Sequence, residues 1–148
     1  MSITRAIEIN HFQLKEKRNW DRTFWFFDIH GTILKPNYQY GNTPSEYYPM
    51  AKETLQLISK IDDIVMIIYT CSHLHEIKEY LDLFKSDNIH FKYVNENPEV
   101  PTDPKGYGNY DKKPYMNVLF EDKSGFDPYV EWEEVYKLLL EKYPDLKK

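Results

Sequence analysis

The sequence predicts an α/β domain of three layers, in which a parallel β-sheet is covered by helices on both faces. Short apolar runs recur along the chain at 23–27, 64–69, 91–94 and 118–120, and uninterrupted apolar runs are typical of strands buried on both faces. Between the runs, apolar residues recur with the spacing of amphipathic helices. Strands that alternate with helices favour right-handed crossovers and therefore a parallel sheet.

The first strand has a polar extension before it and a helix after it. Residues 1–19 fit either a helix or a strand, so we leave them open as an N-terminal extension to a domain at 20–148. The first strand ends at Asp28. A helix is predicted to begin near Pro49, because proline suits the first position of a helix. Its apolar face is formed by Met50, Thr54, Leu57, Ile58 and Ile61.

The same alternation continues through the rest of the chain. The second strand ends at Thr70, and the next helix is predicted to begin at Ser72, a residue type common at N-caps. The segment 95–113 after the third strand is too long for a simple connection. A final helix is predicted from Pro128. The apolar face of the helix after the second strand is formed by Leu74, Ile77, Leu81 and Phe84. The final helix is expected to bury Trp132, Val135 and Leu139.

Composition narrows the class of protein. The 148 residues fit one domain, and the single cysteine, Cys71, excludes an intramolecular disulfide. The net charge of −5 gives no overall basic field to support a nucleic-acid partner. No apolar run is long enough to span a membrane, and the N-terminus lacks a signal-peptide pattern. We therefore expect a cytoplasmic protein without a membrane partner, and leave its oligomeric state open.

Polar residues follow three of the four strands. Asp28 follows the first strand, Thr70 the second, and the pair Glu121-Asp122 the fourth. In open parallel sheets, ligands bind outside the carboxyl ends of the strands. We therefore expect the functional site at this edge of the sheet.

The segment Asp28-Ile29-His30-Gly31-Thr32-Ile33 resembles the first motif, DxDGT, of the haloacid dehalogenase (HAD) superfamily of phosphohydrolases. Thr70 stands where the family has its serine or threonine, and Glu121-Asp122 matches its acidic fourth motif. The resemblance covers roughly residues 22–143. It implies a HAD-like, Rossmann-like fold and a phosphohydrolase activity.

Two positions of the resemblance have alternatives. The family lysine corresponds to Lys112 or Lys113, and we favour Lys113, which precedes Pro114. Asp127 extends the acidic motif, but it also precedes Pro128, as an N-cap residue would. We leave both helix capping and a place in the magnesium shell open for Asp127.

The resemblance implies a Mg²⁺-dependent phosphomonoesterase that forms an aspartyl-phosphate on Asp28. A carboxylate nucleophile divides one difficult step into two, and Mg²⁺ prefers oxygen ligands. The implied ligands of Mg²⁺ are Asp28, the backbone carbonyl of His30, Asp122 and Glu121. The implied phosphate-binding residues are Gly31, Thr32, Thr70, Cys71 and Lys113, of which Thr70 and Lys113 also assist catalysis.

His30 departs from the family pattern, because phosphatases of the family normally have a second aspartate there, which acts as acid and base. Imidazole exchanges protons near neutral pH, so we interpret His30 as the replacement acid/base. Two alternatives stay open. One is a catalytically degenerate module that binds phosphate and Mg²⁺, and the other is a slow phosphotransferase.

The spacing of the motifs leaves no room for an independent cap domain between Asp28 and Thr70 or between Thr70 and Lys113. We therefore expect an open site for a phosphorylated substrate of unknown size. The loops 36–48 and 95–110 are candidates for substrate contact. We also expect Cys71 to be a buried, small apolar residue.

Overall fold

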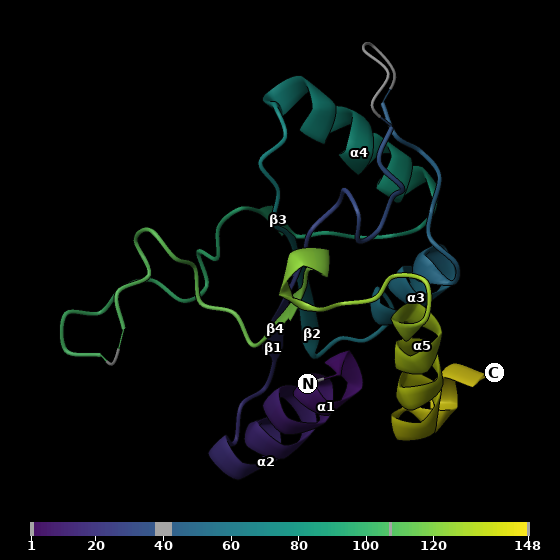
Figure 1. The fold of residues 1–148 in the computed structure, drawn as a ribbon. Helices are drawn as coiled ribbons and strands as arrows, with labels where there is room; N and C mark the ends of the chain where they lie inside the picture. Colours follow the sequence, from purple (N-terminus) through teal and green to yellow (C-terminus); the bar gives the residue numbers. More distant parts are fainter. Residues whose placement is uncertain (1, 38–42, 107, 148) are drawn as a thin grey trace.

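The computed structural model describes residues 2–37, 43–106 and 108–147, and these contain a parallel sheet with the strand order β3-β2-β1-β4 (Figure 1). Residues Thr23–Phe27 form β1 and Ile64–Ile68 form β2, and every residue of both strands is buried. Tyr93–Val94 form β3 and Val118–Phe120 form β4. The predicted parallel α/β architecture is confirmed.

The helices lie close to their predicted positions, with shifted starts. Helix α3 follows Met50, which has a left-handed backbone (φ 65°), and α5 begins three residues after Pro128. His73, rather than Ser72, is the N-cap of α4. The bounds are Ala51–Ile58 for α3, Leu74–Ser86 for α4, Glu131–Lys142 for α5, Asp122–Ser124 for the 3₁₀ turn η2 and Pro144–Lys147 for η3.

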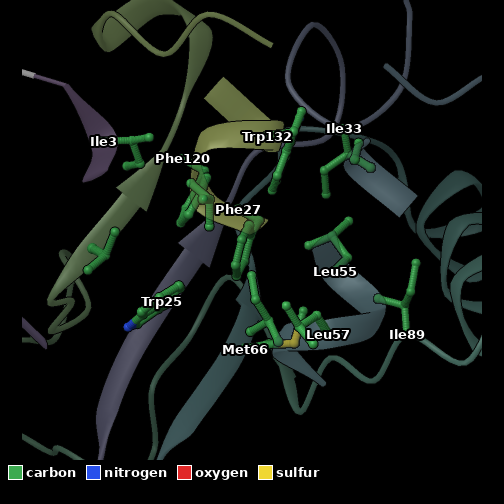
Figure 2. Close-up of a cluster of buried hydrophobic side chains, with 14 of the residues drawn as sticks. Ile3, Trp25, Phe27, Ile33, Leu55, Leu57, Met66, Ile89, Phe120 and Trp132 are labelled. Carbon is green, nitrogen blue, oxygen red and sulfur yellow. The ribbon is translucent and has the colours of Figure 1, made fainter. Parts of the chain in front are cut away.

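The main core lies between one face of the sheet and the helices (Figure 2). Phe120 stacks on Phe27 at 4.5 Å between ring centroids and on Trp132 of α5 at 5.2 Å. Leu55 of α3 and Phe84 of α4 belong to the same buried cluster. Large aromatic side chains therefore hold the ends of β1 and β4 against the helices.

The opposite face of the sheet has a smaller apolar cluster, built on Phe24, Phe26, Val65 and Ile67. Val100, Tyr115 and Met116, from the segment between β3 and β4, pack against it. The third layer of the predicted arrangement therefore consists of irregular chain rather than of helices among the described residues. Part of this segment extends away from the sheet (Figure 1).

The N-terminal segment is helical, which decides between the two alternatives left open by its sequence. The segment forms α1 (Ile3–Ile7), the π-helical stretch η1 (Glu8–Gln13) and α2 (Leu14–Arg18). The backbone N–H of Ile3 donates to the Glu131 carboxylate of α5 at 3.0 Å, and Ile7 is fully buried. The extension thus packs on the main core.

The β1–β2 and β2–β3 connections contain one helix each, α3 and α4, whereas the described residues of the β3–β4 connection contain none. No cap domain is present among the residues described. None of the helices in the described part of the chain has both the length and the apolarity needed to cross a membrane.

Candidate active site

The site is built where β1 ends between its two neighbours. The N–H of Asp28 donates to the carbonyl of Phe120 in β4 at 2.9 Å, and the N–H of Tyr69 donates to the carbonyl of Phe27 at 2.8 Å. The carboxyl ends of β2, β1 and β4 are therefore level with one another. This alignment places the residues that follow the three strands at one edge of the sheet.

Three carboxylates meet at this edge. Asp28, Glu121 and Asp122 each offer an oxygen atom, and the three atoms lie within 4.8 Å of one another. The Oδ1 atom of Asp122 is buried and has no hydrogen-bond partner among the described residues. A buried carboxylate oxygen without a donor is destabilising unless a cation or another donor reaches it. The donor set fits Mg²⁺, which prefers carboxylate oxygens.

The pKa values of the cluster also favour the binding of a cation. Burial, followed by the negative charge of Glu121, raises the pKa of Asp28 to about 6 from its ordinary value of 3.8. Burial, followed by the neighbouring Asp122 carboxylate, also raises the pKa of Glu121. A bound cation would relieve this repulsion and keep the carboxylates ionised.

A tight turn brings Gly31 against the acidic cluster. Gly31 has φ +79°, and its N–H donates to the carbonyl of Leu34 at 3.0 Å. A Cβ atom at this position would lie 2.6 Å from Oδ2 of Asp122. Glycine is therefore required here both by the left-handed backbone and by the close approach of the Asp122 carboxylate.

Thr32 links the turn to the segment after β4. Its side chain is fully buried, and its hydroxyl donates to Oδ2 of Asp28 at 3.1 Å and accepts from the N–H of Asp122, also at 3.1 Å. Its carbonyl accepts from Nε1 of Trp132 at 2.8 Å. Thr32 thus orients the Asp28 carboxylate and anchors the backbone of Asp122, with its hydroxyl occupied by these contacts.

His30 is held by a residue that the sequence analysis did not select. Its Nε2 atom forms a hydrogen bond with the hydroxyl of Tyr80, which comes from α4. Tyr80 is fully buried and has the helical spacing of a core residue between Ile77 and Phe84. Nothing in its sequence position distinguishes it from an ordinary core aromatic residue.

Thr70 is fixed by Asn95, which begins the predicted contact loop 95–110 but was not selected as a site residue. Asn95 accepts from the Thr70 N–H at 2.7 Å and donates to its carbonyl at 2.8 Å. The Thr70 hydroxyl accepts from the N–H of Ser72 at 3.2 Å. The sequence signal that could have identified it is an asparagine directly after the third apolar run, because asparagine tolerates the left-handed backbone that Asn95 adopts (φ 55°).

The predicted lysines and Asp127 form no hydrogen bond or ion pair with the three carboxylates among the described residues. Lys112 and Lys113 are exposed and form no hydrogen bond or ion pair with any described residue, so the choice of Lys113 stays a prediction. Lys123, which the sequence analysis did not select, lowers the pKa of Glu121 through its charge, against the larger effects that raise it. Asp127 accepts from the N–H of Tyr129 at 3.0 Å, as a capping residue does.

One expectation about the segment after β2 is wrong. Cys71 is exposed rather than buried, because it lies beyond the end of β2 and before α4, outside the core. Of the tyrosines in the predicted contact loop 36–48, Tyr38 and Tyr40 lie outside the described residues, whereas Tyr48 is buried.

Comparison with known proteins supports the fold alone. No family model matches the chain, and no curated protein matches it. A solved structure of a conserved protein from Bacteroides thetaiotaomicron is similar, with a TM-score of 0.59 and 20% sequence identity. The similarity covers 82% of this chain and 92% of the other. The α/β architecture thus recurs in a conserved bacterial protein.

Proposed function

We propose that the protein is a Mg²⁺-dependent phosphohydrolase that cleaves phosphate monoesters through an aspartyl-phosphate on Asp28. The observation that carries the proposal is the group of three carboxylates at the ends of β1 and β4, with an unpartnered buried oxygen on Asp122. The DxxGT segment that resembles the HAD motif supplies Asp28 to this group. Thr70 follows β2, the neighbouring strand of the sheet.

In the proposed reaction, a carboxylate oxygen of Asp28 attacks phosphorus as the bond to the leaving oxygen breaks. His30 gives a proton to the leaving oxygen. Water then attacks the phosphorus of the aspartyl-phosphate, His30 takes a proton from that water, and inorganic phosphate leaves with Asp28 restored. Thr32 orients Asp28 throughout, because its hydroxyl donates to the second carboxylate oxygen.

Asp28, Asp122 and the backbone carbonyl of His30 would hold Mg²⁺, with Glu121 as a further ligand. When bound, Mg²⁺ supplies charge neutralisation for the phosphoryl group. We expect an open site, because the described connections contain no cap domain. A cytoplasmic location is part of the same proposal.

A second candidate is a module that binds Mg²⁺ and phosphate without turnover. Lys112 and Lys113 make no ion pair with the acidic cluster in the described residues, and phosphoryl transfer depends on charge neutralisation. Both functions require cation binding. Only the enzyme requires turnover that depends on Asp28.

The experiment is phosphate release from aryl, sugar, nucleotide and oligonucleotide phosphates, with and without Mg²⁺. We expect release with Mg²⁺ that disappears in Asp28→Asn and persists in Asp62→Asn, which changes an exposed aspartate. Mg²⁺ binding without release from any substrate would favour the binding module. Equal release by wild type and Asp28→Asn would contradict the proposed mechanism.

A further inference from the structure

The contact between Tyr80 and His30 joins two separate crossovers of the sheet. His30 belongs to the turn after β1, whereas Tyr80 belongs to the helix after β2. Besides the hydrogen bond at Nε2, the two rings meet edge to face, with centroids 5.3 Å apart and planes at 76°. Ile77 and Phe84 are also buried along α4. The tyrosine hydroxyl is therefore held in a fixed position beside the imidazole.

The direction of this hydrogen bond follows from burial. The hydroxyl of Tyr80 forms no other hydrogen bond with a described residue, and a buried hydroxyl that does not donate is destabilising. A tyrosine phenol ordinarily keeps its proton at neutral pH. The hydroxyl therefore donates to Nε2 of neutral His30. An imidazole that accepts at Nε2 carries its proton on Nδ1.

Because residue 30 is a histidine rather than an aspartate, the orientation and the tautomer of its ring decide which atom can exchange a proton with the substrate. The two oxygens of a carboxylate are equivalent, whereas the two ring nitrogens of histidine differ in position and in protonation. Nδ1 of His30 forms no hydrogen bond with a described residue. With Nε2 occupied by Tyr80, Nδ1 is the nitrogen available for exchange with a substrate.

We propose that Tyr80 is a positioning residue that fixes the ring of His30, selects the Nδ1–H tautomer of its neutral resting form and leaves Nδ1 to exchange protons with the phosphorylated substrate. In turnover, the doubly protonated ring gives its Nδ1 proton to the leaving oxygen. The neutral ring that remains carries its proton on Nε2, and its Nδ1 takes the proton from water. When the ring carries a second proton, Nε2–H donates to the tyrosine oxygen after rotation of the hydroxyl, and the ring orientation stays the same. The tautomer assignment is independent of catalysis, and the effect on turnover rests on the proposed function.

Nitrogen-15 spectra of the histidine rings test the assignment without substrate. Spectra are recorded at about pH 9, where histidine is ordinarily neutral, and His30→Asn identifies the signals of His30. We expect mainly the Nδ1–H form in wild type and its loss in Tyr80→Phe, which keeps the aromatic ring. The control is Tyr143→Phe, because Tyr143 contacts Nε2 of His11 at 2.7 Å. It should alter His11 and leave His30 unchanged.

Kinetics test the role in turnover. We expect Tyr80→Phe to lower kcat by about tenfold or more with KM within about twofold, since positioned acid–base groups contribute factors of this order or larger. The double variant His30→Asn/Tyr80→Phe should be no slower than His30→Asn, because Tyr80 acts through His30. Thermal unfolding checks that each variant is folded.

The possible failures are distinguishable. The same His30 tautomer in wild type and Tyr80→Phe overturns the assignment, whatever the activity. An unchanged kcat in Tyr80→Phe of an active enzyme overturns the positioning role. Absence of any phosphatase activity in wild type contradicts the proposed function, and the tautomer measurement then decides the structural assignment alone.

Discussion

Single residues at the turn after β1 control the geometry of the carboxylates. Gly31 and Gly125 both have positive φ angles, of 79° and 106°, but only Gly31 lies against another group. A Cβ atom on Gly31 would meet Asp122, whereas a Cβ atom on Gly125 would have no heavy atom within 4 Å. Substitution of Gly125 therefore tests backbone strain alone, whereas substitution of Gly31 adds a steric clash with Asp122.

We expect Gly31→Ala to weaken Mg²⁺ binding by about tenfold or more, because displacement of a ligand carboxylate disturbs the coordination geometry. Both Gly31→Ala and Gly125→Ala should lose about 1–3 kcal/mol of stability through their left-handed backbones. Calorimetric Mg²⁺ titration and urea unfolding provide the measurements. Equal Mg²⁺ affinities in the two variants would show that Gly31 does not shape the cation site.

Asp28 opposes folding when no cation is bound. Its pKa is about 6 in the folded protein against an ordinary value of 3.8, so the folded state binds the proton more readily than the unfolded chain. Stability contributed by this group is therefore present at low pH and is lost as pH rises through 3.8 to about 6.

Asp28→Asn should therefore raise the melting temperature of the metal-free protein above pH 6 and have little effect below pH 3.8. The expected rise is about 2–4 °C, as for about 1 kcal/mol in a domain of this size, because partial exposure screens the repulsion. Mg²⁺ should stabilise wild type and not the variant. A lower melting temperature for Asp28→Asn above pH 6 would contradict the electrostatic account.

At the scale of elements, β1, β4 and α5 are coupled through Thr32. Its hydroxyl contacts Asp28 and Asp122, while its carbonyl accepts from Trp132 of α5. Thr54 of α3 offers a comparison, because its buried hydroxyl donates to the Trp132 carbonyl at 2.9 Å without contacting the carboxylates. Both threonines thus stabilise the packing, and only Thr32 orients the acidic cluster.

Thr32→Val and Thr54→Val should each lose about 1–3 kcal/mol of stability, because each leaves a buried polar group without its partner. Only Thr32→Val should also weaken Mg²⁺ binding. Urea unfolding and Mg²⁺ titration distinguish the two effects. A similar loss of Mg²⁺ affinity in Thr54→Val would indicate that the site responds to general packing rather than to the Thr32 hydroxyl.

The sequence predicts these elements well where hydrophobic periodicity is strong. The apolar runs around Trp25 and Met66 identify the central strands, and the position of Asp28, Thr70 and Glu121 after strands identifies the edge of the sheet. Tyr80 could not be selected, because its contact with His30 depends on how α4 packs after a long separation in sequence.

The irregular segment that covers the second face of the sheet also could not be predicted from the sequence. The segment between β3 and β4 uses isolated apolar residues, among them Val100 and Tyr115, to cover the sheet. Such contacts have no helical or strand period, so a pattern search cannot detect them. The helical N-terminus was ambiguous because Ile3, Ile7 and Ile9 satisfy more than one period.

At the scale of the whole molecule, a buried network lies at the end of the sheet opposite the acidic cluster. His11 is fully buried, with Nδ1 2.6 Å from the Thr23 hydroxyl and Nε2 2.7 Å from the Tyr143 hydroxyl. Asp63 also accepts from Tyr143 and pairs with Lys15. This network connects the N-terminal helices, the start of β1 and the end of α5.

The network should make the protein sensitive to acid. Burial, ahead of the opposing charge of Asp63, lowers the pKa of His11 to about 4 from 6.5, so the unfolded chain binds the proton more readily. Stability should fall as pH decreases from 6.5 toward 4, by an amount on the order of a few kcal/mol.

Urea unfolding across this pH range checks the prediction, with His11→Gln as the comparison. The variant should be less stable than wild type at neutral pH, because it loses buried contacts, but the difference should shrink toward pH 4. The comparison removes the opposite contribution of Asp28, which both proteins share. A constant difference would contradict the role of His11.

The central claim is that Asp28 becomes covalently phosphorylated at a Mg²⁺ site. The most direct measurement is mass spectrometry of peptides from protein quenched in acid during turnover of a phosphate monoester. We predict phosphate on Asp28 in the presence of Mg²⁺, and none without the cation or in Asp28→Asn. Turnover by wild type without phosphate on Asp28, or with phosphate on another residue, would contradict the account.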